Sequence, residues 1–305
     1  MHLNEKKNEL RDLIRSTADY LEIKDVYVEK DYWLVRLLKE IFKRDPDYVF
    51  KGGTSLSKCY HLIDRFSEDI DISYSVDYRD IDNEEKNKKF KNVVKAIKKC
   101  ELTVRNPDNL RGDRYFNQFI CPYPSVTGET NIGKQIIVEL AAQTPSYPSN
   151  KRMIRTFISE YLESIGRMDL IELYGLEPFE ITVQSLERTF VDKTFAICDY
   201  YLADTCKNHS RHIYDISKIL PEIKLDDNLV KLYKEIGDRR RGMKVCYSSM
   251  EGVKLHIIVS RIIKEESYKN DYNKLTYGLL YEKYPYELCL DALIKVRAFL
   301  EKNDI

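Results

Sequence analysis

The segment from residue 50 to residue 73 reads FKGGTSLSKCYHLIDRFSEDIDIS, and it combines a glycine pair with two spaced carboxylates. Residues 48–50, which end at the first residue of this segment, are typical of a short buried strand, and the pair Gly52-Gly53 interrupts it. Thr54 is predicted to cap a helix that runs to about Ile63. The segment is therefore expected to form a compact strand-helix-strand unit.

The end of this segment alternates acidic and apolar residues, in the order Asp69, Ile70, Asp71, Ile72. Side chains at positions i and i+2 of a strand share a face, so the two carboxylates point together and the isoleucines point into the core. Two carboxylates near a helix N-terminus, which exposes backbone N–H groups, are suited to Mg²⁺ and phosphates. On spacing alone, an edge strand with ordinary surface acids is an equally good interpretation.

Length and composition limit the classes of protein to which the chain can belong. Its 305 residues, 43% of them hydrophobic, predict one large domain or two of ordinary size. Lys+Arg and Asp+Glu number 50 each, so any binding of nucleic acid needs a local basic patch. The seven cysteines lack paired spacing, the N-terminus is polar, and no run of 18 apolar residues occurs. We therefore expect a cytoplasmic protein.

Periodicity along the chain predicts its regular elements. Apolar residues at helical spacing predict helices at 3–22, 27–44, 83–99, 153–165, 185–203, 211–220, 229–236, 255–265 and 285–300. Strands are predicted at 48–50, 69–73, 114–121, 134–140 and 179–183, with a turn-rich loop at 121–133. Since strand signal fades after residue 183, we expect an α+β lobe at 1–185 and a helical lobe at 186–305.

Four further positions outside the segment are candidates for chemistry. Glu139 shares a strand face with Ile137, which makes it a candidate third carboxylate, and an acid paired with a lysine or arginine is the alternative. Lys193, on a predicted helix, suits a triphosphate as a point charge, although helix lysines are usually solvated. Arg211 and Asp215 are four residues apart on the next helix, which by itself is typical of a surface salt bridge.

Two basic stretches are candidate docking places for an RNA backbone or a nucleotide tail. The first is the run of residues 238–244, with the cations Arg239, Arg240, Arg241 and Lys244, for which a solvated helix end is an equally good interpretation. The second is the exposed face of the helix at 83–99, which contains Lys86, Lys88, Lys89, Lys91, Lys95, Lys98 and Lys99.

Five blocks together resemble the AbiEii/AbiGii toxin family, the nucleotidyltransferase-like toxins of type IV toxin–antitoxin systems. They are VEKDYWLVRLLKEIF (28–42), FKGGTSLSK (50–58), RFSEDIDIS (65–73), ERTFVDK (187–193) and SRHIYDI (210–216). The resemblance spans roughly residues 28–220. It implies a DNA polymerase β-like nucleotidyltransferase fold, a mixed sheet flanked by helices, with a helical C-terminal half that contributes to the active-site cleft.

The resemblance also implies roles for individual residues. The metal would be bound by Asp69, Asp71 and Glu139, which with Lys193 and Asp215 form the expected catalytic set. Asp215 would orient Lys193 or Arg211. The expected nucleotide-binding residues are Gly52, Gly53, Thr54, Ser55, Lys58, Arg65, Ser67, Lys193 and Arg211.

The activity that the resemblance implies is nucleotidyl transfer by a toxin. With Mg²⁺ or another divalent cation, the enzyme would transfer NMP from an NTP to a hydroxyl and release pyrophosphate. The tRNA 3′ end is the leading acceptor, and a separately encoded antitoxin is the expected partner in abortive infection. Two alternatives stay open: the same fold acting on a small-molecule or protein hydroxyl, and a non-catalytic nucleotide-binding module.

Overall fold

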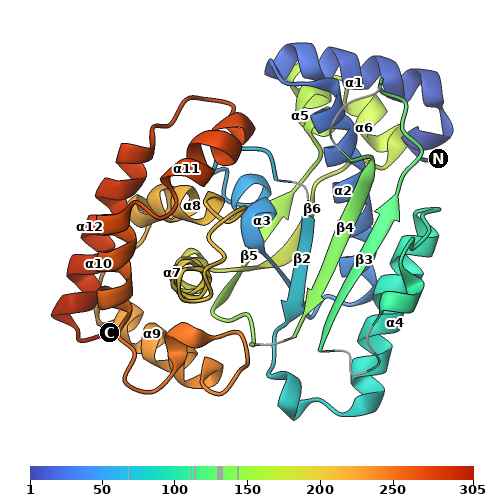
Figure 1. Ribbon diagram of the computed structural model, residues 1–305. Coiled ribbons are helices and arrows are strands. Elements are labelled where there is room, and N and C mark those ends of the chain that lie inside the picture. Colours follow the sequence, from blue (N-terminus) through green and yellow to red (C-terminus); the bar gives the residue numbers. More distant parts are fainter. Residues whose placement is uncertain (68, 111, 113–114, 129–132, 143) are drawn as a thin grey trace. The chain divides into compact units, whose positions relative to one another are not determined.

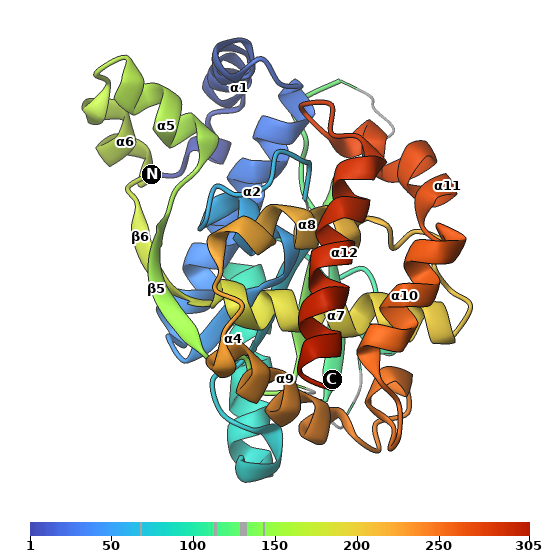
Figure 2. The ribbon, with the colours of Figure 1, turned by 90° about the vertical axis from the view of Figure 1, so that its left-hand side faces the viewer.

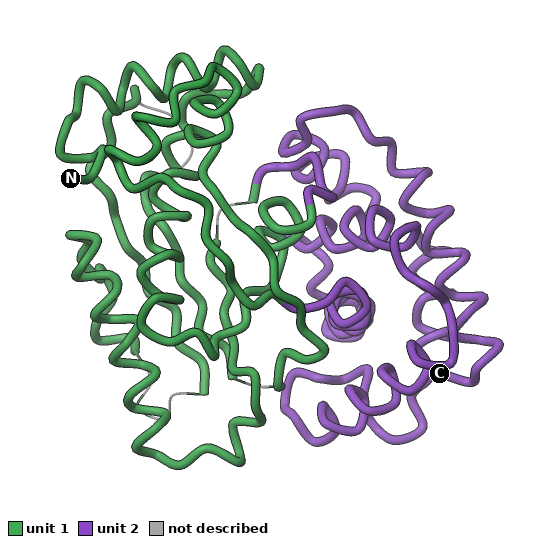
Figure 3. Tube along the Cα trace, turned by 180° about the vertical axis from the view of Figure 1, so that it is seen from behind, with its two compact units in different colours: residues 1–60, 67–183 green, residues 61–66, 184–305 purple. Residues whose placement is uncertain are grey.

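The computed structural model describes residues 1–305 except 68, 111, 113–114, 129–132 and 143. The chain divides into two compact units, residues 1–60 with 67–183 and residues 61–66 with 184–305 (Figure 3). The chain therefore leaves the first unit for six residues, contributes them to the second unit, and returns. No helix among the described residues is long and apolar enough to span a membrane.

The first unit is built around a mixed sheet whose described strands run in the order β3-β4-β2-β1-β6-β5 (Figure 1). Their bounds are β1 Tyr48–Lys51, β2 Asp69–Tyr74, β3 Phe116–Pro122, β4 Gln135–Ala141, β5 Ser149–Ile154 and β6 Phe179–Gln184. Strand β2 is antiparallel to β1 and parallel to β4, while β1 is parallel to β6 and β4 antiparallel to β3. Because β1, β2 and β4 have neighbours on both sides, side chains on their faces are held in register.

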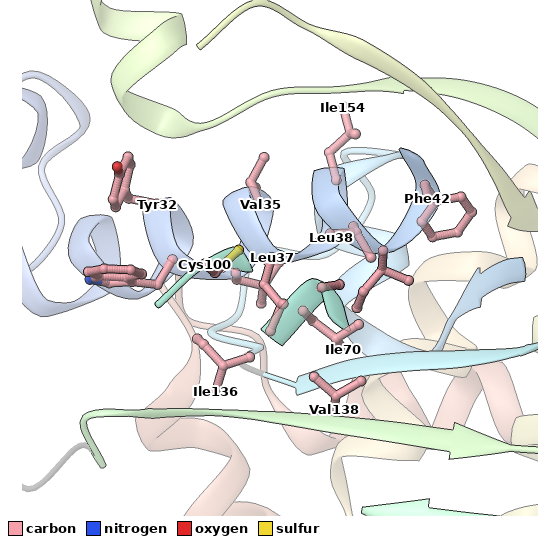
Figure 4. Close-up of a cluster of buried hydrophobic side chains, with 14 of the residues drawn as sticks. Tyr32, Val35, Leu37, Leu38, Phe42, Ile70, Cys100, Ile136, Val138 and Ile154 are labelled. Atoms are coloured by element: carbon pink, nitrogen blue, oxygen red, sulfur yellow. The ribbon is translucent and has the colours of Figure 1, made fainter. Parts of the chain in front are cut away.

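One face of this sheet forms the hydrophobic core with helix α2, Asp25–Arg44. Figure 4 shows Leu37 and Leu38 of this helix beside Ile70 and Val138 of the sheet, and all four side chains are fully buried. Burial of each such side chain stabilises the fold by about 1.5–3 kcal/mol. The other helices of the unit are α1 Lys7–Leu21, α3 Gly52–Lys58, α4 Asn83–Lys99, α5 Phe157–Ser164 and α6 Met168–Tyr174.

The second unit is helical. Its helices are α7 Leu186–Leu202, α8 Arg211–Ile219, α9 Asp227–Arg240, α10 Leu255–Glu265, α11 Lys269–Asp271 and α12 Tyr286–Lys302. Helix α12 packs against α8 and α10, as Figure 2 shows, and α7 packs against α8. Ser185 caps α7, since its hydroxyl accepts a hydrogen bond from the N–H of Arg188.

Backbone hydrogen bonds attach the segment 61–66 to this helical unit. The N–H of Phe66 donates to the carbonyl of Leu279 at 2.9 Å, and the N–H of Tyr281 donates to the carbonyl of Asp64 at 2.8 Å. The hydroxyl of Tyr214 accepts from the N–H of Asp64 at 3.0 Å. The segment is therefore paired like a short strand, and this pairing competes with helix formation.

The fold class predicted from the sequence, a mixed sheet flanked by helices with a helical C-terminal half, is confirmed. The helix predicted to run from Thr54 to about Ile63 is wrong at both ends, because α3 begins at Gly52 and ends at Lys58. Its N-cap is Lys51, so Thr54 lies inside the helix.

A second correction concerns the helix predicted at 153–165. Strand β5 continues to Ile154, and α5 starts only at Phe157, after Thr156 has capped it by accepting a hydrogen bond from the N–H of Ser159. The strand predicted at 114–121 is β3, and Arg114 lies outside the described residues.

Candidate active site

The sheet face opposite the core carries a row of polar side chains across four strands. Asp71 of β2 is in register with Lys51 of β1 and with Glu139 of β4, and Glu139 is in register with Gln118 of β3. Asp69 lies two residues before Asp71 and therefore on the same face. Side chains at paired positions of neighbouring strands are adjacent, so Asp71 and Glu139 are neighbours, and all three predicted carboxylates lie on this face.

Glu139 is held by a neutral partner on the neighbouring strand. The Nε2 atom of Gln118 donates a hydrogen bond of 2.9 Å to its Oε1 atom, and both side chains are half-buried. An amide orients a carboxylate without cancelling its charge. Among the described residues, the side-chain partner of Glu139 is therefore an amide, whereas the alternative predicted from the sequence was a lysine or an arginine.

Asp71 lies against the backbone of Gly52 at the start of α3. Gly52 has a φ of +77°, and a Cβ atom built on it would lie 1.9 Å from Oδ2 of Asp71. Only glycine leaves room for the carboxylate there, and only glycine adopts this φ without strain. The sequence predicts a glycine break at this point, but the contact depends on the pairing of β1 with β2.

The hydroxyl groups of α3 and of the strand entry are close together. Thr54 Oγ1 and Ser67 Oγ are 3.0 Å apart, and Ser55 Oγ donates to the carbonyl of Gly52 at 2.8 Å. Hydroxyls that share a hydrogen bond can each turn to a new acceptor. Thr54 and Ser67, both predicted to bind the nucleotide, are thus neighbours.

Lys58, also predicted to bind the nucleotide, is part of a buried ion pair. Its ammonium lies 2.7 Å from Oδ1 of Asp31 and 3.8 Å from the ring centroid of Phe157, and both charged side chains are buried. Burial raises the pKa of Asp31, and the charge of Lys58 opposes that shift. The pair attaches α3 to α2, so Lys58 has a structural role that the sequence did not reveal.

Three charged side chains meet inside the helical unit. Arg65 donates to Asp215 through Nε and through one terminal nitrogen, both at 2.8 Å, and Lys193 Nζ donates to the same carboxylate at 2.6 Å. Asp215 is fully buried. The resemblance predicts that Asp215 orients Lys193 or Arg211, and the structure contains the contact with Lys193. The partner that the sequence did not reveal is Arg65, whose remaining terminal nitrogen donates to the carbonyl of Phe66.

Charge and burial act in opposite directions on this cluster. Burial alone would raise the pKa of Asp215, but the charges and hydrogen bonds of Arg65 and Lys193 outweigh it and hold that pKa below its ordinary value. Burial lowers the pKa of Lys193, and the attraction of Asp215 only partly offsets this shift. Arg211, at the first position of α8, is exposed. The cluster therefore has two cations on one carboxylate.

The predicted basic patch at 239–244 is largely engaged with neighbouring acids. Arg240 forms an ion pair with Asp199, and its guanidinium lies 4.9 Å from the ring centroid of Phe195. The other two arginines pair with acids of their own helix, Arg239 with Glu235 at 3.4 Å and Arg241 with Asp238 at 2.8 Å. Lys244 is exposed. Arg240 is thus part of the fold of the helical unit.

Whether a metal ion fits the acidic face depends on which side-chain atoms are available there as ligands. No three His, Cys, Asp or Glu side chains of the described residues are gathered closely enough to hold a metal ion by themselves. Mg²⁺ commonly uses one or two protein carboxylates and completes its coordination with water and substrate phosphates. Asp69 and Asp71 supply hard oxygen donors of this kind, so they fit Mg²⁺ bound together with a nucleotide.

Comparison with known proteins gives a family and a fold. A family model described as nucleotidyl transferase AbiEii toxin, type IV TA system, matches residues 36–293. The nucleotidyltransferase toxin MenT4 from Mycobacterium tuberculosis H37Rv has a similar structure, with a TM-score of 0.56 and 20% sequence identity over 95% of this chain and 89% of that chain. A putative nucleotidyltransferase from H. pylori gives a TM-score of 0.45 and 13% identity over 92% and 96% of the two chains. A comparison with curated proteins finds no match.

Substitution of Gly52 tests the contact with Asp71. We expect Gly52→Ala to lower the free energy of unfolding by about 2–3 kcal/mol, because a left-handed φ costs about 1–2 kcal/mol and the carboxylate must also move. The matched control is Gly166→Ala, since Gly166 has a φ of +73° but nothing within 4 Å of its Cβ position. Urea denaturation measures the free energy of unfolding of both variants. Equal decreases for Gly52→Ala and Gly166→Ala would show that the contact with Asp71 is unimportant.

Removal of the charge of Asp215 tests the buried cluster. We expect Asp215→Asn to lower the free energy of unfolding by about 3–5 kcal/mol, because two buried cations then lack a counter-ion. Lys193→Met leaves the pair of Arg65 and Asp215 intact and should cost less. The control Asp64→Asn removes a half-exposed acid that pairs with Lys218 in the same unit, and should cost at most about 1 kcal/mol. Guanidinium denaturation distinguishes these variants, and an equal cost for both aspartates would contradict the prediction.

The pH dependence of stability follows from the lowered pKa of Asp215. The unfolded chain protonates this group near its ordinary pKa of about 3.9, whereas the folded chain keeps it ionised to lower pH. The stabilisation is therefore complete above about pH 5 and declines as the pH falls toward the folded pKa. We expect the stability difference between the unaltered protein and Asp215→Asn to shrink between pH 6 and pH 3. A difference that is constant over this range would contradict the assignment.

Proposed function

Because the chain belongs to the AbiEii nucleotidyltransferase family of type IV toxin–antitoxin systems, we propose that it transfers NMP from an NTP to the 3′ end of tRNA with the help of Mg²⁺. The chain is a nucleotidyltransferase, and the family implies an NTP substrate and an antitoxin partner. The observation that supports metal-assisted nucleotidyl transfer is the acidic row on the sheet, in which Asp71 lies against Gly52 and in register with Glu139.

The reaction is a displacement at the α-phosphorus of the NTP. A ribose hydroxyl oxygen of the RNA forms a bond to this phosphorus, the bond from phosphorus to the oxygen that bridges the α- and β-phosphates breaks, and pyrophosphate leaves with the electron pair. The hydroxyl proton is lost to a base or to water. Such transfers need positioning and neutralisation of phosphate charge more than covalent chemistry by the protein.

In our proposal, the residues of the acidic row and the neighbouring hydroxyls have separate roles in the transfer. Asp69 and Asp71 would hold Mg²⁺, and the ion would supply charge neutralisation at the phosphate oxygens. Glu139 accepts the hydroxyl proton or helps to hold the cation, and its hydrogen bond from Gln118 keeps the carboxylate oriented for either task. The hydroxyls of Thr54 and Ser67, 3.0 Å apart, are the proposed donors to the phosphates.

Lys193 is the proposed cationic ligand of the β- and γ-phosphates. Its ammonium has three N–H donors, and the hydrogen bond to Asp215 uses one of them. Asp215 is already neutralised by the bidentate bond from Arg65, so Lys193 retains net positive charge for an anionic ligand. In this proposal Asp215 and Arg65 position Lys193, while Lys193 itself binds the substrate.

The double variant Asp69→Asn/Asp71→Asn tests the proposal. The protein is incubated with Mg²⁺, each α-labelled NTP in turn and total tRNA, and the label in the tRNA is measured. We expect the variant to transfer at least about a hundredfold less label, because the metal ligands and their charge are lost. Asp12→Asn, a change of an exposed aspartate on α1, is the matched control and should keep full activity.

Each outcome of this experiment has a definite meaning. Label that enters tRNA only with intact Asp69 and Asp71, and that disappears on chelation of Mg²⁺, supports the proposal. Label in a small molecule or a protein would replace tRNA with that acceptor. Equal transfer by the double variant and the control would refute the assignment of the two acids.

A further inference from the structure

Helix α4 has an unusual distribution of charge. Its two glutamates lie in the first turn, and the rest of the helix has seven lysines and no acid. The exposed lysines at positions i, i+3, i+7 and i+10 lie within about 80° of the helix circumference, given 3.6 residues per turn. We refer to these four residues as the lysine stripe: Lys88, Lys91, Lys95 and Lys98.

Packing fixes the rotation of α4 so that the lysine stripe faces outward. Val93, Ala96 and Ile97 are buried on the opposite side of the helix and belong to the core of the sheet unit. Lys89 is also buried, and its ammonium forms an ion pair of 3.0 Å with Asp45. One lysine of α4 is thus used to anchor the helix, which leaves the stripe to solvent. Figure 1 shows α4 alongside β3, which lies at one edge of the sheet.

The charge of the lysine stripe is mostly uncompensated. Lys88 forms an exposed pair with Glu85 at 3.2 Å, whereas Lys91, Lys95 and Lys98 have no carboxylate partner among the described residues. Like charges three or four residues apart destabilise a helix by a few tenths of a kcal/mol per pair. In a chain with a net charge of zero, this local repulsion is a cost that a polyanionic ligand would remove.

We propose that the lysine stripe binds the phosphate backbone of the acceptor RNA. This inference rests on the proposed function, which supplies an RNA substrate. The stripe extends about 15 Å along the helix axis, long enough to contact several phosphates of a strand that has one charge per about 3.4 Å. The contacted backbone and the reacting 3′ end are different parts of the RNA, so the stripe and the acidic row need not share a sheet face.

The surroundings of the lysine stripe favour RNA over a membrane or a protein partner. The apolar face of α4 is buried in the core, so the helix has no side that can enter a bilayer. No large hydrophobic side chain of α4 is exposed. Protein interfaces are depleted of lysine and depend on aromatic and arginine anchors, which this face lacks. Phosphate contacts need only accessible cations.

The test compares two variants with the same change in charge. In one, all four residues of the lysine stripe are changed from Lys to Gln. In the control, four exposed lysines of α9, α10 and α12 are changed to Gln: Lys231, Lys264, Lys295 and Lys302. Binding to an unmodified tRNA transcript is measured by fluorescence anisotropy over a range of KCl concentrations, and circular dichroism checks that both variants are folded.

We expect the stripe variant to lose more than about tenfold in affinity at low salt. The slope of log K against log[KCl] should fall by about 3 in magnitude, because each lost phosphate contact contributes about 0.7–0.9. The control should bind like the unaltered protein, and both variants should bind an isolated NTP normally. Equal RNA affinity and equal slopes for the two variants would overturn the inference.

Failure of this inference is distinguishable from failure of the proposed function. If the unaltered protein labels tRNA and the stripe variant binds and labels tRNA like the control, the inference fails and the proposed function stands. If no RNA is labelled but RNA binding still depends on the stripe, the inference stands and the proposed function fails. Stripe-dependent binding to vesicles of phosphatidylserine and phosphatidylcholine, without a stripe effect on RNA, would assign the surface to membranes and overturn the inference.

Discussion

The close contact between Asp71 and the backbone of Gly52 constrains the whole acidic face of the sheet. Strand β2 must supply Ile70 and Ile72 to the core and Asp69 and Asp71 to the opposite face, and a shift by one residue would exchange these sets. The antiparallel pairing of β2 with β1 brings Asp71 to the point where the chain turns from β1 into α3. A left-handed glycine at that turn leaves space for the carboxylate, so strand register and turn geometry are coupled there.

The ratio of cations to acids differs between the buried ion pairs of the sheet unit and the charged cluster around Asp215. In the sheet unit, Lys58 pairs with Asp31, and Lys89 pairs with Asp45 and lies 3.7 Å from Glu85, so no cation there exceeds its acids, and these pairs attach α3 and α4 to the structure around them. In the helical unit, Asp215 receives both Arg65 and Lys193, so one positive charge exceeds the acids of this cluster. Burial of excess charge is costly, and a ligand phosphate is a natural counter-ion. The unequal stoichiometry is therefore the strongest physical argument for Lys193 as a binding residue.

Local periodicity was enough to predict most elements and the shared face of Asp69 and Asp71, because both depend on neighbours in the sequence. The contacts that define the site are not local. Arg65 meets Asp215 across 150 positions of the chain, and the pairing of residues 61–66 with residues 279–281 shortens a helix that local signals extend to Ile63. Strand β5 was missed because five of its six residues are exposed and lack alternation. The resemblance of the block at 50–58 made Lys58 a predicted nucleotide-binding residue, and nothing in its local sequence points to the ion pair with Asp31.

The lysines of this neutral chain occur in three different environments, which composition alone does not distinguish. Lys58 and Lys89 are buried counter-ions, Lys193 is a buried cation with a shared partner, and the lysine stripe is solvated. Solvated lysines keep their hydration and side-chain entropy until a polyanion binds, and they then release counter-ions from it. Binding of that kind is sensitive to salt and tolerant of sequence, whereas a buried cation with fixed partners discriminates by geometry. Helix α4 contains lysines of two of these kinds, since Lys89 is a buried counter-ion of Asp45 and the lysine stripe is exposed to solvent.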